Sequence, residues 1–322
     1  MSIFHWFKPA QKGRIKRTPF DLNEYQLLTG DLHCHSCHSM DGVFSVQKIA
    51  NFCAAAGMDF AAITDHNSIG ALPEEAQQKD FIFLPGSECT LDESCGHFNV
   101  LGITDIDLRP DMTEKEEIVE YMQLMRSRGA AIQLNHPFAG GLGWHVGWDV
   151  PFDLVEIWNR TNSPKNQNAI NWWHDQLCQG KRIPATGGTD SHTTKSERYP
   201  INCVFAREKT ADAIFEAVKL GHNFISECTY GPWLQLKIGS SIMGDVVACT
   251  ADTQLEVFVD HMEPDYTVLL ISDQGEELRH EAEQSYFRAT IPVAANRRFY
   301  RLEVRRGAKL AAISNPIYCT WA

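Results

Sequence analysis

Short apolar runs alternate with helix-like patterns between residues 27 and 225 of this chain. Several of these runs are almost continuously apolar, which is typical of strands that are covered on both faces. They span residues 60–63, 81–84, 130–134, 154–158 and 183–185. Because covered strands that alternate with helices build parallel sheets, the pattern predicts a parallel α/β sheet or barrel.

Helices are expected between these runs, and their ends can be recognised. Ser45 is a capping residue for the first helix, and Thr113 with Glu116 forms a capping box for the second. Each expected helix is followed by a glycine, which readily adopts the left-handed conformation found at helix ends. The expected helices span residues 45–56, 113–128, 166–179 and 210–220.

The pattern changes after residue 232, where short alternating runs follow one another with turn residues between them and no helical period. The runs span residues 255–259, 267–271, 286–291 and 299–304, and Asp273-Gln-Gly marks one of the turns. Residues 233–322 are therefore predicted to form a small antiparallel β-sandwich domain. It would pack on the α/β domain of residues 25–232, which residues 1–24 precede as an N-terminal tail.

The composition is that of an ordinary globular protein, with 322 residues, 43% of them hydrophobic, and a formal net charge of −12. This negative charge argues against a nucleic-acid partner, because such proteins need a basic face. The ten cysteines are scattered and follow no secretory signal, which favours reduced thiols and a cytoplasmic protein. Cys34 and Cys37 form a C-x-x-C without a second pair, so a redox or zinc-ribbon site is an alternative interpretation only. No stretch approaches the length of a membrane span.

Residues 30–42 read GDLHCHSCHSMDG and contain the first candidate chemistry. Side chains two apart on a strand point the same way, so His33 and His35 can both bind one metal ion. Imidazole together with carboxylate ligands suits zinc, manganese or iron, and ligands from several strands favour an open catalytic site. For this motif alone, a polar surface turn is the alternative.

Further polar residues stand where other apolar runs end. Because the carboxyl ends of barrel strands form one rim, these separate positions are expected to converge. Any one of them alone has a structural explanation, such as a hydrogen bond or a turn cap, but their joint positions predict a metal centre. The further candidates are Asp41, Asp65, His66, Glu88, His97, His136, Asp190 and His192.

The ordered motifs DLHCHS, TDH, GSE, GHFN, NHP and GTDSH resemble the PHP (polymerase and histidinol phosphatase) family of metal-dependent hydrolases over most of residues 27–230. GDLHCHS, GHFNVLG and the late SNPIY are most similar to its branch of CehA/McbA-type ester hydrolases. The resemblance implies a distorted (β/α)7 barrel that holds two to three divalent metal ions, manganese, iron or zinc.

The resemblance also implies a set of ligands for each ion. The three expected sets are His33, His35, Glu88 and Asp190; the bridging Glu88 with His97 and His136; and Asp41, His66 and His192. One departure concerns Asp41, which stands eight residues after the first histidine, whereas many family members have this aspartate at the seventh.

Such a centre is expected to hydrolyse esters. Two close cations lower the pKa of a bridging water, present hydroxide at neutral pH and neutralise charge on the attacked centre. Asp65 is expected to orient a ligand or to carry a proton, and His38 or His192 to protonate the leaving oxygen.

A phosphorylated substrate would need cations at the rim, and the candidates beyond the ends of apolar runs are Arg160, Lys165, Lys195 and Arg198. Solvated loop charges are the alternative for these residues. His145 is expected to line or cover the pocket, with a structural position as its alternative. An aromatic ester would instead need an apolar pocket, for which the candidates are Trp144, Trp148 and Trp158.

The favoured function is therefore metal-dependent phosphoester hydrolysis on a small phosphorylated molecule. Carboxylic or carbamic ester hydrolysis of the CehA/McbA type is the first alternative, and exonuclease action, against which the acidic charge argues, is the second. A metal-stabilised binding module without catalytic activity is a third interpretation. The β domain either covers part of the barrel or forms a contact within a homo-oligomer.

Overall fold

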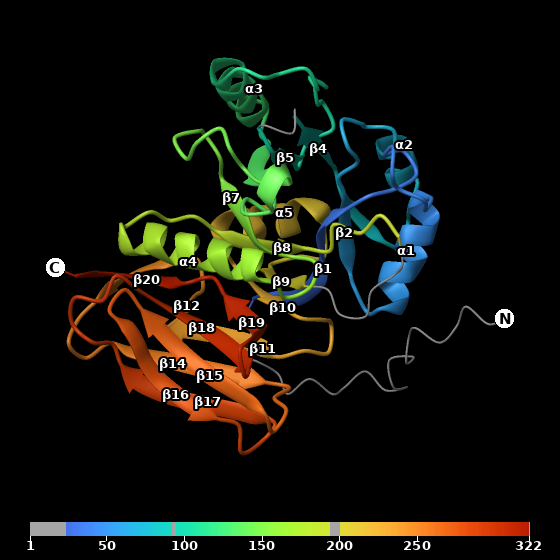
Figure 1. Ribbon diagram of the computed structural model, residues 1–322. Coiled ribbons are helices and arrows are strands. Elements are labelled where there is room, and N and C mark those ends of the chain that lie inside the picture. The colour runs from blue at the N-terminus through green and yellow to red at the C-terminus, as the bar shows by residue number, and fades with distance from the viewer. Residues whose placement is uncertain (1–23, 92–94, 194–199, 322) are drawn as a thin grey trace.

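The computed structural model describes residues 24–91, 95–193 and 200–321 (Figure 1). The predicted N-terminal tail, apart from residue 24, and the candidates Lys195 and Arg198 lie outside these residues. None of the helices in the described ranges combines the length and the apolar character that a bilayer crossing requires.

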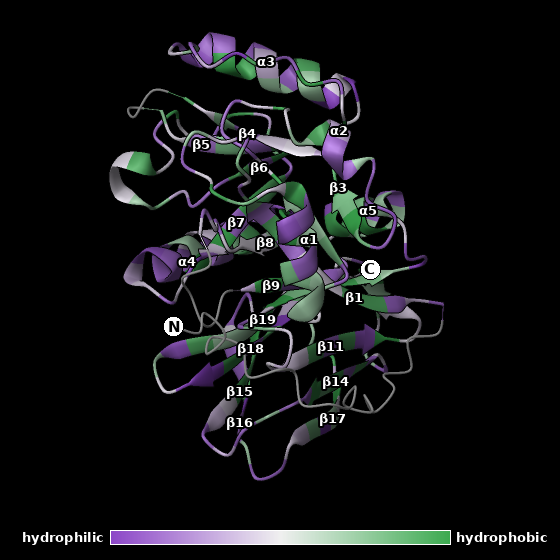
Figure 2. Cartoon of the chain, turned by 90° about the vertical axis from the view of Figure 1, so that its right-hand side faces the viewer, coloured by the Kyte–Doolittle hydropathy of each residue, from purple (hydrophilic) through white to green (hydrophobic). Residues whose placement is uncertain are grey.

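The predicted helices are present with small shifts at their ends. They are α1 (Val46–Ala55), α3 (Lys115–Ser127), α4 (Pro164–Cys178) and α5 (Ala211–Leu220), and a short helix α2 (Leu72–Glu75) adds to them. α1, α3 and α5 each bury one apolar stripe; that of α3 consists of Ile118, Tyr121, Met122 and Met125. In Figure 2 hydrophilic and hydrophobic residues alternate along α1 and α3, as expected for helices that cover a sheet on one side and face solvent on the other.

Hydroxyl caps hold three of these helices at their first turn. The side chains of Ser45, Ser163 and Thr210 accept hydrogen bonds from backbone N–H groups at the starts of α1, α4 and α5. The capping box predicted for α3 is wrong. Glu114 is the N-cap residue there, and the Thr113 hydroxyl donates instead to the Glu114 carboxylate at 3.4 Å. The hydroxyl lies one residue too early in the chain to reach the free N–H groups of the helix.

Two sheets form the α/β part of the molecule. In the first, β1 (Gln26–Cys34), β2 (Phe60–Ile63) and β3 (Ile82–Leu84) are parallel, and β9 (Ile201–Ala206) and β10 (Asn223–Ser226) continue the sheet antiparallel beyond β1. The second has the order β4 (Gly86–Thr90), β5 (His97–Leu101), β6 (Ala131–Leu134), β7 (Leu154–Asn159) and β8 (Ala185–Gly188). The predicted apolar runs thus form β2, β3, β6 and β7, and the last run ends where β8 begins.

The two sheets meet at the carboxyl ends of their parallel strands. Isolated bridges pair Cys34 with Ser191 and His66 with Glu88, and the Asp190 N–H donates to the His33 carbonyl at 2.7 Å. The predicted α/β class is confirmed, but the sheets are not parallel throughout, because β4, β5 and β6 pair antiparallel and so do β1 and β9. The fold is mixed α/β, and the backbone contacts at residues 34, 66 and 190 connect its two sheets at strand ends.

The region after residue 232 is built from strands, and no helix occurs between residues 233 and 321. These strands are β11 (Trp233–Ile238), β12 (Ser241–Ile242), β13 (Val246–Cys249), β14 (Gln254–Asp260), β15 (Tyr266–Ser272), β16 (Gly275–Glu281), β17 (Tyr286–Pro292), β18 (Phe299–Arg306), β19 (Lys309–Ser314) and β20 (Ile317–Trp321). The sheet β12-β11-β14-β17 packs through side chains such as Leu236 and Val257 on a sheet that contains β15 and β18. The sheet that contains β15 and β18 is continuous with the first sheet of the α/β part, because β19 pairs antiparallel with β10.

Candidate metal centre

The predicted metal ligands lie together where the two sheets meet. His33 lies at the next-to-last position of β1, and His35 and Asp41 follow this strand. Glu88 and His97 lie on the neighbouring strands β4 and β5, and the other candidates follow β2, β6 and β8. Four overlapping groups have their ligand atoms within 4.8 Å of one another. These groups are His33, His35 and Asp190; His33, Glu88 and His136; His66, Glu88 and His97; and His35, His66 and His192.

Glu88 lies at the middle of this cluster and is fully buried. Its Oε2 atom is 3.4 Å from Nε2 of both His33 and His35 and 2.9 Å from Nδ1 of His66. Its Oε1 atom is 3.2 Å from Nδ1 of His97 and 3.5 Å from Nε2 of His136. One carboxylate therefore faces imidazoles that come from different strands, with one oxygen toward each side of the cluster.

Asp190 faces the same histidine pair as Glu88 does. Its Oδ1 atom is 3.3 Å from Nε2 of His35 and 3.7 Å from Nε2 of His33. The backbone is strained at two candidates, because φ is +46° at Asp190 and +28° at His136. Positive φ at residues other than glycine costs free energy and is found most often at functional sites.

A third side of the cluster faces outward. Nε2 of His192 and Nε2 of His66 are 3.3 Å apart, and Oδ2 of Asp41 is 3.0 Å from the first and 3.7 Å from the second. The side chain of Asp41 is 51% exposed, whereas His33, His35 and Glu88 are buried. The later position of Asp41 in the sequence therefore still brings its carboxylate to these histidines.

Several buried atoms of the cluster make no hydrogen bond. They include Nε2 of His33, both ring nitrogens of His35 and Nδ1 of His136. Buried polar atoms without a partner are costly, and a cation among them would satisfy those lone pairs that face the cluster. Imidazole nitrogen with carboxylate oxygen is a donor set for zinc, manganese or iron, so these residues fit divalent metal ions.

The charge states in the cluster differ from residue to residue. Burial lowers the pKa of His35 to about 4, so this ring is neutral and able to bind a metal at neutral pH. Burial also opposes protonation of His33, but the carboxylates of Glu156, Glu88 and Asp190 outweigh it and raise its pKa well above the usual value. Burial alone would raise the pKa of Glu88, and the surrounding histidines hold it well below its ordinary range instead.

Glu156 on β7 supports the cluster, although it belongs to none of the motifs that point to metal ligands. This buried carboxylate is 3.0 Å from Nδ1 of His33 through Oε1 and accepts the His136 N–H at 2.8 Å through Oε2. β8 passes so close that a Cβ atom at Gly188 would collide with both Glu156 and His33. The available signal was the single charged residue within the otherwise apolar run 154–158.

Two further polar residues hold the candidates from behind. Asn135 donates from Nδ2 to Glu88 Oε1 at 2.8 Å, and Asp31 accepts hydrogen bonds from the N–H groups of His33 and Thr189, each at 3.1 Å. Carboxylates and amides that orient ligands in this way are a regular part of metal sites.

The three candidates for proton transfer lie in different surroundings. Both carboxylate oxygens of Asp65 accept hydrogen bonds at 2.6 Å from Ser36, one from the N–H and one from the hydroxyl. His38 pairs through Nε2 with Glu74 at 2.8 Å, and it belongs to none of the four groups of candidate ligand atoms found among the described residues. His192 belongs to the cluster itself. Asp65 is thus placed to hold the loop that contains His35, and burial raises its pKa.

Of the rim cations, the described residues include Arg160, which lies beside the cluster. Its Nε donates to Asp190 Oδ2 at 3.0 Å, and its side chain remains 52% exposed. His145 is exposed and pairs through Nε2 with the Gly140 carbonyl at 2.9 Å. Trp144 and Trp158 are buried in the apolar core, and the ring of Trp148 stacks on that of Trp172 with 4.0 Å between centroids. These three tryptophans therefore pack within the fold rather than against the metal candidates.

Comparison with known proteins gives one family match. Residues 31–140 match the PHP domain family. Over 183 residues the chain is 26% identical to the DNA polymerase/3'-5' exonuclease PolX of Bacillus subtilis (strain 168). This alignment covers 46% of the chain and 30% of that relative, so the chain spans less than a third of the relative's length.

A crystal structure from Bacteroides vulgatus ATCC 8482 has a similar fold. It is described as a two-domain protein containing a predicted PHP-like metal-dependent phosphoesterase. The alignment has a TM-score of 0.53 at 16% identity and covers 92% of this chain and 97% of the other. The likeness extends over both the α/β part and the strands that follow it, which supports the β-rich C-terminal region.

Proposed function

We propose that this chain is a metal-dependent hydrolase of the PHP type that acts on phosphoesters of small molecules. The observation that carries the proposal is the convergence on Glu88 of buried imidazoles whose nitrogens include several without hydrogen bonds. The match of residues 31–140 to the PHP domain supports the same class of protein. A non-catalytic module would need no exposed side to its metal cluster, whereas Asp41 and Arg160 leave one side of this cluster open.

The geometry supports the following assignment of ligands. His33, His35, Glu88 and Asp190 would hold a first ion, and Glu88 with His97 and His136 a second. His66, His192 and Asp41 would hold a third on the exposed side. When bound, divalent ions supply a nucleophile by lowering the pKa of water, and they neutralise negative charge as it develops on the ester.

The protein's own residues position and balance this centre. Glu156 fixes the ring of His33 with Nδ1 toward the carboxylate, which leaves Nε2 facing Glu88 and Asp190. Asn135 orients the Glu88 carboxylate through its hydrogen bond to Oε1. Nε2 of His192 points to Asp41 and His66, so we assign His192 to ion binding rather than to proton transfer. Asp65 acts through its hydrogen bonds to Ser36, as a positioning residue.

Two features favour a phosphoester over an aromatic carboxylic or carbamic ester. Arg160 presents a half-exposed guanidinium next to Asp190, and guanidinium groups bind phosphate through paired hydrogen bonds. Trp144 and Trp158, two of the tryptophans proposed to line an aromatic pocket, are buried in the apolar core, and Trp148 stacks on Trp172. Exonuclease action is a second candidate because of the 26% identity to PolX, but the net charge of −12 does not suit a polyanionic substrate.

A substrate panel tests this proposal. Metal-loaded protein is assayed on 4-nitrophenyl phosphate, bis(4-nitrophenyl) phosphate, 1-naphthyl methylcarbamate and single-stranded DNA, with Asp190→Asn as the inactive control. We expect turnover of at least one phosphoester and a loss of about 100-fold or more in Asp190→Asn, in which the first ion loses a charged ligand. Turnover of the carbamate alone would show a carbamic ester hydrolase instead of a phosphoesterase, and turnover of DNA alone would show a nuclease. No turnover of any compound by fully metal-loaded protein would contradict a hydrolase.

A further inference from the structure

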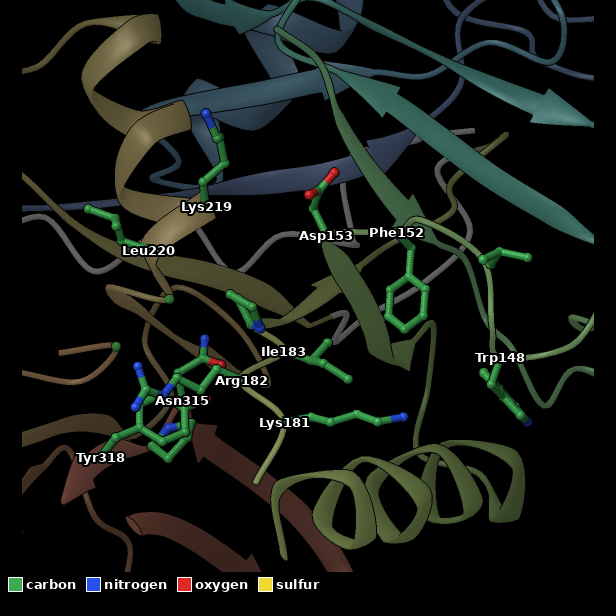
Figure 3. A pocket seen from close by; sticks show the side chains of 15 residues that line it. Trp148, Phe152, Asp153, Lys181, Arg182, Ile183, Lys219, Leu220, Asn315 and Tyr318 are labelled. Carbon is green, nitrogen blue, oxygen red and sulfur yellow. The ribbon is translucent and has the colours of Figure 1, made fainter. Parts of the chain in front are cut away.

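A cavity of about 500 Å³ lies outside the metal centre (Figure 3). Its walls come from the segments that precede β7 and β8, from the end of α5 and from the C-terminal strands. In Figure 3 Phe152 and Asp153 lie on one side, and Arg182 and Tyr318 lie on another. The volume falls within the usual range for sites that bind small molecules.

The cavity and the metal centre lie at opposite ends of the same strands. Asp153 and Pro184, which line the cavity, stand directly before β7 and β8, whereas Arg160 and Asp190 follow the other ends of these strands. At about 3.3 Å per residue, six residues of strand separate the two sites by roughly 20 Å. A molecule in the cavity would therefore not touch the metal ligands.

The charges around the cavity are mainly positive, in a chain whose net charge is −12. Lys181, Arg182 and Lys219 line it. Lys219 is paired with Glu216 at 3.0 Å, and the one carboxylate among the described lining residues, Asp153, is paired with Arg126 at 2.9 Å. In the part of the chain that the structure describes, neither Lys181 nor Arg182 has a carboxylate partner. Nζ of Lys181 donates to the amide oxygen of Gln176, and the guanidinium of Arg182 lies 5.5 Å from the ring centroid of Tyr318.

Apolar and aromatic side chains form the rest of the wall. Trp148, Phe152, Ile183 and Tyr318 all line the cavity, and Ile183 and Tyr318 are otherwise buried. Flat apolar groups bind well against such side chains, and a guanidinium that is already stacked on a ring can still pair with an anion at its edge. The wall therefore offers apolar surface for a ring and donors for an acidic group.

We propose that this cavity binds a small aromatic anion, one or two rings that carry a carboxylate, sulfonate or phosphate group. The acidic group would pair with Arg182, while Lys181 adds positive charge from another part of the wall, and the ring would lie against Phe152, Ile183 and Tyr318. The site is independent of the hydrolytic reaction, since it lies at the other end of β7 and β8.

Naphthalene-2-sulfonate is a suitable probe, because it combines two rings with an anion that binds metals weakly. We expect the full-length, metal-loaded protein to bind it saturably in isothermal titration calorimetry, and to bind the neutral 2-naphthalenemethanol more weakly. The double variant Lys181→Ala/Arg182→Ala should bind the sulfonate at least about tenfold more weakly, since hydrogen bonds to charged groups are lost. Arg182→Gln, which keeps a polar group of similar length, should show part of this loss.

A matched control removes the same types of charge elsewhere. Lys48→Ala/Arg279→Ala changes one lysine on α1 and one arginine on β16, neither of which lines the cavity. Its affinity should stay within about twofold of the wild type. The proposal is overturned if the wild type does not bind the sulfonate, or if the two double variants bind it equally well. It is also overturned if Asp190→Asn abolishes binding while the double variant at residues 181 and 182 retains it, because the probe would then sit at the metal centre.

Discussion

At the scale of single residues, two buried carboxylates organise the candidate metal centre. Glu88 faces the imidazoles, and Glu156 holds one of them in place from behind. Solvent water cannot stabilise the charge of either carboxylate, because both side chains are almost fully buried. Their charge is balanced by the histidines and, in the proposed hydrolase, by metal ions.

Glu156→Gln tests the supporting carboxylate. Glutamine has only one acceptor oxygen, so it cannot accept hydrogen bonds from both the His33 ring and the His136 N–H, and one of these two ligands loses its orientation. We expect metal affinity to fall by about 10- to 100-fold, measured as the chelator concentration that removes half of the metal. The visible absorption of the cobalt-substituted protein should change as well, because the ligand field changes.

Glu276→Gln is the control for this measurement, since Glu276 forms a surface ion pair with Arg279 at 2.7 Å. It should release metal at the same chelator concentration as the wild type. If Glu156→Gln also matches the wild type in chelator midpoint and in spectrum, Glu156 does not position His33.

Glu75 gives a prediction for the dependence of stability on pH. Burial raises the pKa of Glu75 to about 8 from its ordinary value of 4.5, and its Oε1 atom makes no hydrogen bond. Between these two values the folded state keeps a proton that the unfolded chain releases, so this residue lowers stability as the pH rises. Glu75→Gln should therefore increase the free energy of unfolding at pH 8 and change it little at pH 4.5. Urea denaturation at both pH values measures this, and an equal effect at both would contradict a raised pKa.

The residues that carry chemistry were predictable where they stand in motifs at strand ends. His33 and His35 follow this rule at the end of β1, whereas Glu88 follows an apolar run but lies within β4. The structure brings Nε2 of each histidine to 3.4 Å from the Glu88 carboxylate. Glu156 was not predictable in the same way, because a charged residue inside an apolar run is also compatible with an ordinary buried strand. The surroundings of Asp65 and His38 were not predictable either, since their partners Ser36 and Glu74 depend on the path of the loops.

At the scale of elements, local sequence signals predict the positions of helices and strands better than they predict which strands pair and in which direction. Continuous apolar runs became covered strands, and Ser45, Ser163 and Thr210 cap the helices that follow them, whereas Thr113 does not. The direction in which strands pair was less accessible, because the run of residues in β4 and β5 contains no signal that distinguishes antiparallel from parallel pairing. The direction of pairing depends instead on where the connecting loops place each following strand.

A hydroxyl that caps its helix should contribute more to the free energy of unfolding than a hydroxyl before a helix that does not cap it. The Ser163 hydroxyl accepts the Asn166 N–H at 3.3 Å, whereas the Thr113 hydroxyl contacts a side chain instead of the free N–H groups of α3. Ser163→Ala should lower the free energy of unfolding by about 1 kcal/mol, and Thr113→Ala by a few tenths at most. Thermal or urea denaturation of the two variants provides the comparison. Equal losses would mean that Thr113 caps its helix after all.

At the scale of the whole molecule, the α/β part and the C-terminal strands share one sheet and one core. β19 pairs with β10, and Leu310 and Ile313 lie in the same apolar cluster as Trp158 and Trp173. The sequence pattern predicts a boundary near residue 232 because the composition changes there. Pairing between β10 and β19 joins residues almost 90 positions apart, and no local pattern can reveal it.

Removal of residues 233–322 should therefore destabilise the α/β part. The edge of β10 would lose its partner, and apolar side chains under β19 would meet water. We expect the fragment 1–232 to be aggregated or partly unfolded, as measured by circular dichroism and light scattering. In the full chain, Ile313→Ala should cost about 2–4 kcal/mol, while Lys309→Ala on the exposed end of the same strand costs little. A monomeric fragment that melts at the temperature of the full chain would contradict the shared core.

The central claim is that Glu88 and the surrounding histidines hold divalent metal ions. The most direct test is the metal content per chain, measured by plasma mass spectrometry on protein purified without chelator, with Asp190→Asn and His136→Ala beside the wild type. We predict two or three manganese, iron or zinc ions in the wild type and fewer in each folded variant. One ion or none in the wild type, unchanged in both variants and not increased by added metal, would contradict a multinuclear metal centre.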